Sequence, residues 1–454
     1  MPSSICTGPL KRREFLRAGT LALGGLGLSD LLRLQARAAQ PARDTSVILF
    51  WMWGGPSQLE TYDCKPEAPS EYRGPLRPIQ TTVPGMDICE VFPLQAKLGH
   101  RFSLVRSLHH KMASHNDGSI ELLTGKTPAK EDVTSTAKSD HPDFGMIASR
   151  LRGQPADGLP RYVGVPRVPF MVQPTYLGMA HAGFAAGDPS VANYRPKNLI
   201  LDAGIGGARL DDRRGLVAQL DRYRRANDLN GAVEATDQFR QQAFQLLTST
   251  KVADAFHLDA EKPTTRDRYG RHLWGQSCLL ARRLAEAGTS VITIDALSPV
   301  PGNPIYFSWD DHSNPLTGWN LEGAMRWRAP FMDQGLSALI EDIYARGLDQ
   351  KIMVVAVGEF GRTPRLASPQ GVLGRDHWPA AQSALISGGG LRMGQVVGAT
   401  TSKAEYPIER PLTPQYLLAT IYRHLGIDPR ETLNDFGGRP VAILPDGEPI
   451  RELV

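Results

Sequence analysis

The chain has few cysteines and, beyond its first forty residues, no long apolar run. Only 4 cysteines occur in 454 residues, and none has the C-x-x-C spacing of a zinc ribbon or a thioredoxin-like motif. The sequence allows one disulfide bond, such as Cys64 to Cys89, but does not establish it. No later segment reaches the roughly 18 uninterrupted apolar residues of a membrane-spanning helix. We therefore predict no transmembrane segment in the mature chain.

The chain also lacks an excess of either charge. Its 51 Lys and Arg residues nearly balance its 47 Asp and Glu residues, which leaves a formal net charge of +4, and the two signs are interspersed. Nucleic-acid binding leaves a concentrated basic footprint, so we exclude that class of partner. We find no internal repeat and no low-complexity tract, and we predict a single domain over residues 40–454.

The amino-terminal residues have the features of an export signal. The run KRREFLR at 11–17 resembles the twin-arginine signature, and residues 18–32 are apolar but rich in glycine and too short to span a bilayer. Ala36 and Ala38 have the spacing that signal peptidase requires. An amphipathic helix is the alternative. We predict that residues 1–39 are a twin-arginine signal peptide and that the mature protein is periplasmic or secreted.

Buried strands alternate with helices along the mature chain. Two of the expected helices end near a glycine and lead directly into an apolar strand, which is typical of a parallel sheet covered by helices on both faces. The proline-rich segments 66–84 and 155–174 are expected to be surface excursions. The expected helices are 211–256, 266–287 and 324–345, and the expected strands are 46–52, 102–108, 290–295, 351–357 and 383–386.

Acidic and histidine side chains follow these strands. The carboxyl ends of parallel strands meet at one edge of a sheet, so we expect such side chains to converge there. A mixed set of carboxylates and imidazoles suits a transition metal better than calcium. For any one residue, a loop histidine or a helix-capping acid is an equally common role. The candidates are Ser57, Glu60, Asp63, His109, His110, His115, Asn116, Asp117, Asp310, His312, Glu359, Arg362 and His377.

Five motifs, in order, resemble a known family. GGPSQLETYD, VRSLHHKMASHNDGSIELLTG, WDDHSN, VGEFGRTPR and GRDHWP are similar to those of the secreted bacterial proteins called domain of unknown function 1501. That family is grouped with the alkaline phosphatase and sulfatase superfamily. The resemblance implies an α/β, alkaline-phosphatase-like fold, in which a large, mostly parallel sheet is sandwiched between helices and carries one or two metals at the strands' carboxyl ends.

The resemblance assigns roles residue by residue. Sulfatases place a formylglycine nucleophile about nine residues before a Thr-Gly pair, and counting back from Thr124 gives His115, with no cysteine nearby. Formylglycine chemistry is therefore excluded at this position. The acid that the superfamily places after the first strand is absent, because Trp53-Gly54 stands there. The implied metal ligands are Asp310, His312, Glu359 and His377, with Asp63 as a later acid after the first strand.

These residues predict a metal-dependent hydrolase of phosphate or sulfate esters acting outside the cytoplasm. The metal would be a divalent ion such as zinc, and the substrate a small-molecule or glycan anionic ester. His115 would be a metal ligand, a general acid or a covalent acceptor, and Arg362 would bind a substrate oxygen or form a salt bridge with a neighbouring acid. The alternative is a catalytically inert member of the superfamily that binds a polyanionic glycan or a partner protein.

Overall fold

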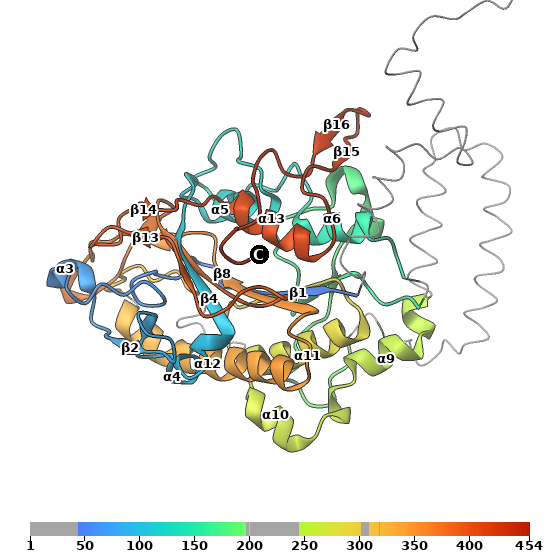
Figure 1. Ribbon diagram of the computed structural model, residues 1–454, viewed down its shortest axis with the longest axis horizontal. Helices are drawn as coiled ribbons and strands as arrows, with labels where there is room; N and C mark the ends of the chain where they lie inside the picture. Colours follow the sequence, from blue (N-terminus) through green and yellow to red (C-terminus); the bar gives the residue numbers. More distant parts are fainter. Residues whose placement is uncertain (1–43, 156, 197–198, 200–244, 301–307, 317) are drawn as a thin grey trace, which may run out of the picture. The chain divides into compact units, whose positions relative to one another are not determined.

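An eight-stranded sheet organises the described part of the chain (Figure 1). The computed structural model describes residues 44–155, 157–196, 199, 245–300, 308–316 and 318–454. The strands lie in the order β12 (Val396–Val397), β4 (Phe102–Leu108), β11 (Gln382–Gly388), β8 (Ile352–Val357), β1 (Ser46–Trp51), β7 (Val291–Asp295), β5 (Tyr162–Val165) and β6 (Phe184–Ala185). Neighbouring strands are parallel, except that β11 is antiparallel to β4 and β8. The predicted α/β class with a mostly parallel sheet is confirmed.

Helices cover both faces of this sheet (Figure 1). Helices α5 (His115–Thr124), α6 (Phe144–Leu151) and α13 (Pro414–His424) lie on one face. The other face carries α9 (Thr250–Phe256), α10 (Pro263–Tyr269), α11 (Leu273–Ala287) and α12 (Leu321–Ala345). Strand β1 supplies Val47 and Leu49 to the first core and Ile48 and Phe50 to the second. Burial on both faces explains why β1 is apolar at successive positions.

Shorter elements surround the sheet. The other helices of the described residues are α3 (Ser70–Arg73), α4 (Pro93–Ala96) and the 3-10 turns Gly99–Arg101, Thr175–Leu177, Met179–His181, Leu258–Ala260 and Pro369–Gly371. The small strand pairs are β2 (Pro78–Gln80) with β3 (Asp87–Cys89), β9 (Gly361–Arg362) with β10 (His377–Trp378), β13 (Ala399–Thr400) with β14 (Pro407–Glu409), and β15 (Thr432–Asn434) with β16 (Pro440–Ala442). The β9–β10 pair matters most for the site, because it sets Arg362 directly opposite His377.

Three local predictions need correction or completion. The helix expected at 266–287 is two helices, α10 and α11, because the chain turns at Gly270 with φ of +94°. The proline-rich segment 155–174 is not wholly a surface excursion, since β5 within it is buried and pairs with β7. Most of the helix expected at 211–256, and the signal peptide predicted at 1–39, lie outside the described residues.

The described residues form one compact unit. Among the described residues no helix combines the length and the apolar character needed to cross a membrane. Cys64, Cys89 and Cys278 are free thiols in the structure.

Candidate metal centre

The candidate site lies at the carboxyl edge of the sheet and centres on the carboxylate of Asp310. Asp310 and His312 are in the loop that follows β7, His115 opens helix α5 after β4, and His377 opens β10. The Nε2 atom of His115 is 3.3 Å from Asp310 Oδ2. The Nε2 atoms of His312 and His377 are 3.0 Å and 3.3 Å from Asp310 Oδ1. His115, Asp310, His312 and His377 therefore lie close together, as their positions after predicted strands indicated.

The turn before α5 places His115. Ser114 is the N-cap of this helix, and its hydroxyl accepts a hydrogen bond from the backbone N–H of Asp117. The backbone N–H groups of Ala113 and Ser114 both donate to Glu131 Oε1, at 2.6 Å and 2.7 Å. These bonds fix the chain on entry to the helix, so His115 projects from its first turn toward the cluster.

Each of the three imidazoles has its Nδ1 atom bound to a group that only accepts hydrogen bonds. His115 Nδ1 lies 2.7 Å from Glu359 Oε1, His312 Nδ1 2.8 Å from Asp376 Oδ1, and His377 Nδ1 2.6 Å from the carbonyl of Ala113. Each Nδ1 must therefore carry the proton. In the neutral imidazoles all three Nε2 lone pairs then face the Asp310 carboxylate. This is the tautomer that metal-binding histidines adopt.

The cluster requires a positive charge at its centre. His312 Nε2 and His377 Nε2 are 3.0 Å apart, and in the neutral tautomers neither has a proton to share. Without a metal, protons would fill this place. Burial disfavours the charged form of His115, but the hydrogen bonds that His115 donates to Asp310 and Glu359 outweigh it and raise its pKa to about 9. The pKa of His312 is raised by its hydrogen bond to Asp310, whereas burial lowers that of His377.

The donor set fits a divalent transition metal. The ligand atoms of His115, Asp310 and His377 all lie within 4.8 Å of one another. Two donors of a tetrahedral zinc site are roughly 3.3 Å apart when each bond is about 2.0 Å long. The contacts of His115 and His377 with Asp310 are both 3.3 Å. In addition, the buried Oε2 atom of Glu359 has no hydrogen-bond partner. A cation would compensate this carboxylate.

Glu359 lies behind His115 and not in the three-residue ligand set. It is fully buried, and its Oε1 accepts from His115 and from the backbone N–H of Gly54 at 2.8 Å. A Cβ atom on Gly54 would come within 2.6 Å of the backbone of Asp310, and its φ is +112°. The loop after β1 thus contributes a backbone donor where the superfamily resemblance implies an acidic side chain.

Arg362 forms the salt bridge that was one of its two predicted roles. Its guanidinium is fully buried and pairs with Asp310, with Nη2 also donating to the carbonyl of Gly54. Nε donates to the carbonyl of Gly55 at 2.8 Å, and Nη1 to that of Arg375 at 3.1 Å. The pKa of the Asp310 carboxyl, which burial would raise, is instead held far below its usual range by Arg362 and the surrounding histidines.

The structure does not bring Asp63 to this cluster. Its Oδ1 lies 2.9 Å from Lys65 and 3.7 Å from Arg106, and the hydroxyl of Thr400 donates to its other oxygen. Glu60 is likewise engaged elsewhere, in a buried pair with Arg375 at 2.7 Å. The reason is the length of the loop after β1, because only its first residues stay at the sheet edge.

Sequence reasoning missed the aromatic walls of the site. The ring of Trp53 stacks on His115 with centroids 5.0 Å apart, and that of Phe360 lies 5.2 Å from His115 and 4.6 Å from His377. Both follow strand ends, the same signal that identified the acids. Apolar walls exclude water and strengthen electrostatic interactions inside the site.

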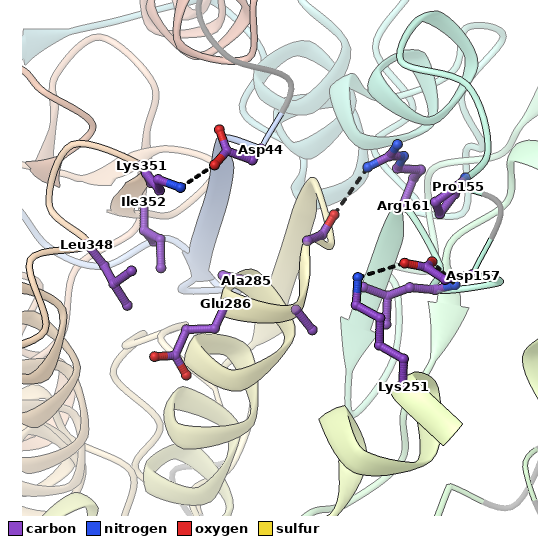
Figure 2. A pocket seen from close by; sticks show the side chains of 13 residues that line it. Asp44, Pro155, Asp157, Arg161, Lys251, Ala285, Glu286, Leu348, Lys351 and Ile352 are labelled. Carbon is purple, nitrogen blue, oxygen red and sulfur yellow. Dashed lines mark hydrogen bonds and ion pairs between the residues drawn. The ribbon is translucent and has the colours of Figure 1, made fainter. Parts of the chain in front are cut away.

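A separate pocket of about 540 Å³ lies at the opposite edge of the sheet (Figure 2). Asp44 and Ile352 line it, at the amino ends of β1 and β8. Lys351 pairs there with Asp44, and Lys251 with Asp157 at 2.6 Å (Figure 2). It therefore does not extend the histidine cluster.

Several solved structures are similar to this chain over most of its length. They include the lipoteichoic acid synthase LtaP from Listeria monocytogenes (10% identity, 91% of this chain, 79% of that chain, TM-score 0.38). The PsFucS1 sulfatase from Pseudoalteromonas sp. (11%, 92%, 72%, 0.36) and the phosphonate monoester hydrolase SpPMH from Silicibacter pomeroyi (13%, 89%, 75%, 0.32) are further examples. No curated protein matches the chain in sequence. The family model "Protein of unknown function (DUF1501)" matches residues 44–454, and the chain therefore belongs to this family.

Proposed function

We propose that this protein is a metal-dependent hydrolase of phosphate or sulfate esters that acts outside the cytoplasm. The observation that carries the proposal is the convergence of the Nε2 atoms of His115 and His377 on the single carboxylate of Asp310, each imidazole held in the metal-binding tautomer by its Nδ1 bond. A buried salt-bridge network alone does not require this arrangement of lone pairs.

His115, Asp310 and His377 are the proposed ligands, and the metal is a divalent transition metal such as zinc. When bound, such an ion supplies Lewis-acid stabilisation of the charge that develops on an ester oxygen. Glu359 orients His115 through the Nδ1 bond. Arg362 orients Asp310 from the buried side, where its donors are taken by backbone carbonyls.

His312 is the proposed general acid. It is the most exposed of the three imidazoles, with 38% of its side chain accessible, and Asp376, its Nδ1 partner, is 67% exposed. This pair connects the cluster to solvent, so His312 can hold a proton near the leaving oxygen and regain it from water. The sequence-based set of ligands includes His312. With His312 as a fourth ligand the site would be closed, as in structural zinc sites, and this would favour the inert binding protein.

Metal analysis of two variants separates these possibilities. We expect the purified wild-type chain to contain about one transition metal ion and to hydrolyse p-nitrophenyl phosphate or sulfate, with activity lost to a chelator. His377→Ala should lose the metal, while His100→Ala, a histidine outside the cluster, should keep it. His312→Ala should keep the metal and lose turnover by roughly 10²- to 10⁴-fold.

Each other outcome has a defined meaning. Loss of metal in His312→Ala would make it a fourth ligand and support the inert alternative. A folded wild-type chain that neither retains nor takes up zinc, manganese or iron would refute the metal-dependent hydrolase.

A further inference from the structure

An aromatic ring and two cations lie beside the candidate metal centre, and the mechanism above does not use them. Phe170 is 41% exposed, and its ring centroid is 6.3 Å from that of Trp53, the residue that stacks on His115. Phe170 lies in the loop after β5, which runs parallel to β7. Because parallel strands share a carboxyl edge, this loop comes to the same edge as the cluster.

The two cations are held in place around the Phe170 ring. The Nζ atom of Lys138 lies 4.6 Å from the ring centroid and donates to the carbonyl of Phe170 at 2.6 Å. The guanidinium carbon of Arg167 lies 5.9 Å from the same centroid. Cation–π contacts of this kind are individually weak, but here they hold two positive side chains around one exposed ring.

Arg167 is further fixed by Asp295, a buried acid at the end of β7. Its Nε donates to Asp295 Oδ2 at 2.7 Å, while 47% of the Arg167 side chain remains exposed. Among the described residues, neither Nη group of Arg167 donates a hydrogen bond. Its planar fork is therefore oriented and available for a second anion.

We propose that Trp53, Phe170, Arg167 and Lys138 form a subsite for the remainder of the substrate, and that the substrate is an anionic glycan with a second charged group. This inference rests on the proposed function. One sulfate or phosphate ester would lie at the metal centre, and a second anionic substituent would bind Arg167 and Lys138. The partly exposed ring of Trp53 lies between the two places, where the apolar C–H face of a sugar ring packs on an aromatic surface.

Binding of a heparin-derived tetrasaccharide to the metal-loaded protein tests the subsite without relying on turnover. Lys138→Gln should weaken its binding, measured by calorimetry, by roughly tenfold, as expected for a lost hydrogen bond to a charged group. Phe170→Ala should weaken it by about two- to tenfold. Arg167→Lys, which keeps the charge beside Asp295 but loses the fork, should also weaken binding. Arg430→Gln, an exposed arginine elsewhere, should have no effect.

Two controls make the test decisive. The metal content of purified Lys138→Gln and Phe170→Ala should equal that of the wild type, so that weaker tetrasaccharide binding does not reflect loss of the metal centre. Inorganic tripolyphosphate, which is charged but has no sugar ring, should bind more weakly than the tetrasaccharide and should lose less affinity in Phe170→Ala than the tetrasaccharide does.

The outcomes also separate this inference from the proposed function. Unchanged tetrasaccharide binding in both Lys138→Gln and Phe170→Ala would overturn the subsite even if the aryl esters are hydrolysed. If tripolyphosphate binds as tightly as the tetrasaccharide, the subsite is a nonspecific cationic patch and the assignment of a glycan substrate is overturned. If no ester is hydrolysed but the variants lose tetrasaccharide binding, the subsite stands and the hydrolase proposal fails.

Discussion

Replacing Glu359 with glutamine should weaken metal binding without unfolding the protein. Glutamine has the same shape and retains an oxygen that accepts from Gly54 and His115, at the 2.8 Å and 2.7 Å seen for Glu359 Oε1. What is lost is the negative charge that orients the His115 imidazole and increases its basicity. Such partners of metal-binding histidines typically contribute 10- to 100-fold to metal affinity, or about 1.4–2.7 kcal/mol. We therefore expect Glu359→Gln to raise the zinc dissociation constant by a factor in this range.

Competition with a chromogenic chelator measures this change directly. Asp333→Asn is the matched control, because Asp333 is also a buried acid that accepts two backbone N–H groups, those of Leu94 and Gln95, but lies on helix α12 away from the cluster. It should leave the zinc dissociation constant unchanged. If Glu359→Gln binds zinc as tightly as wild type while His115→Ala does not, the carboxylate does not act through His115 and our account of Glu359 is wrong.

Three further results are expected. Arg362→Met should lower the free energy of unfolding of the chelator-treated protein in urea by roughly 3–5 kcal/mol, because it removes the fully buried guanidinium that pairs with Asp310 and binds the carbonyls of Gly54 and Gly55. Replacing Arg12 and Arg13 with lysine should retain the precursor in the cytoplasm, as followed by cell fractionation; unchanged export would refute the twin-arginine signal. Burial raises the pKa of Asp143 from 3.8 to about 6, so its contribution to stability should fall as pH rises between these values, and Asp143→Asn should flatten that part of a urea-denaturation pH profile.

The sequence predicted the fold and the location of the site because both depend on features that are local in the chain. The apolar runs that became β1, β4, β7, β8 and β11 lie within a residue or two of their expected bounds. Once those strands are assigned to one sheet, the neighbourhood of Asp310, His312 and Glu359 follows from parallel strand ends meeting at one edge. The lengths of the apolar runs and their periodicity were sufficient to predict these strands.

The roles of individual residues were less predictable because they depend on backbone groups from distant loops. The tautomer of His377 is set by the carbonyl of Ala113, and the buried position of Arg362 by the carbonyls of Gly54 and Gly55. A sequence shows side chains but not which carbonyl points at them. The sequence also could not exclude Asp63 from the site, because the hydroxyl that binds Asp63 belongs to Thr400, 337 residues away in the chain.

The charges of the cluster connect the proposed metal to the choice of an anionic substrate. Without a metal, the carboxylates of Asp310 and Glu359 are opposed by the Arg362 guanidinium and by His115, whose pKa of about 9 keeps it protonated at neutral pH. The centre is then close to neutral. His115 Nε2 would have to give up its proton to hold a divalent ion, and this exchange would add one positive charge inside aromatic walls. Asp376 is mostly exposed and screened by solvent. The cluster should therefore attract sulfate or phosphate esters more strongly when a metal is bound, so metal loading should favour substrate binding as well as chemistry.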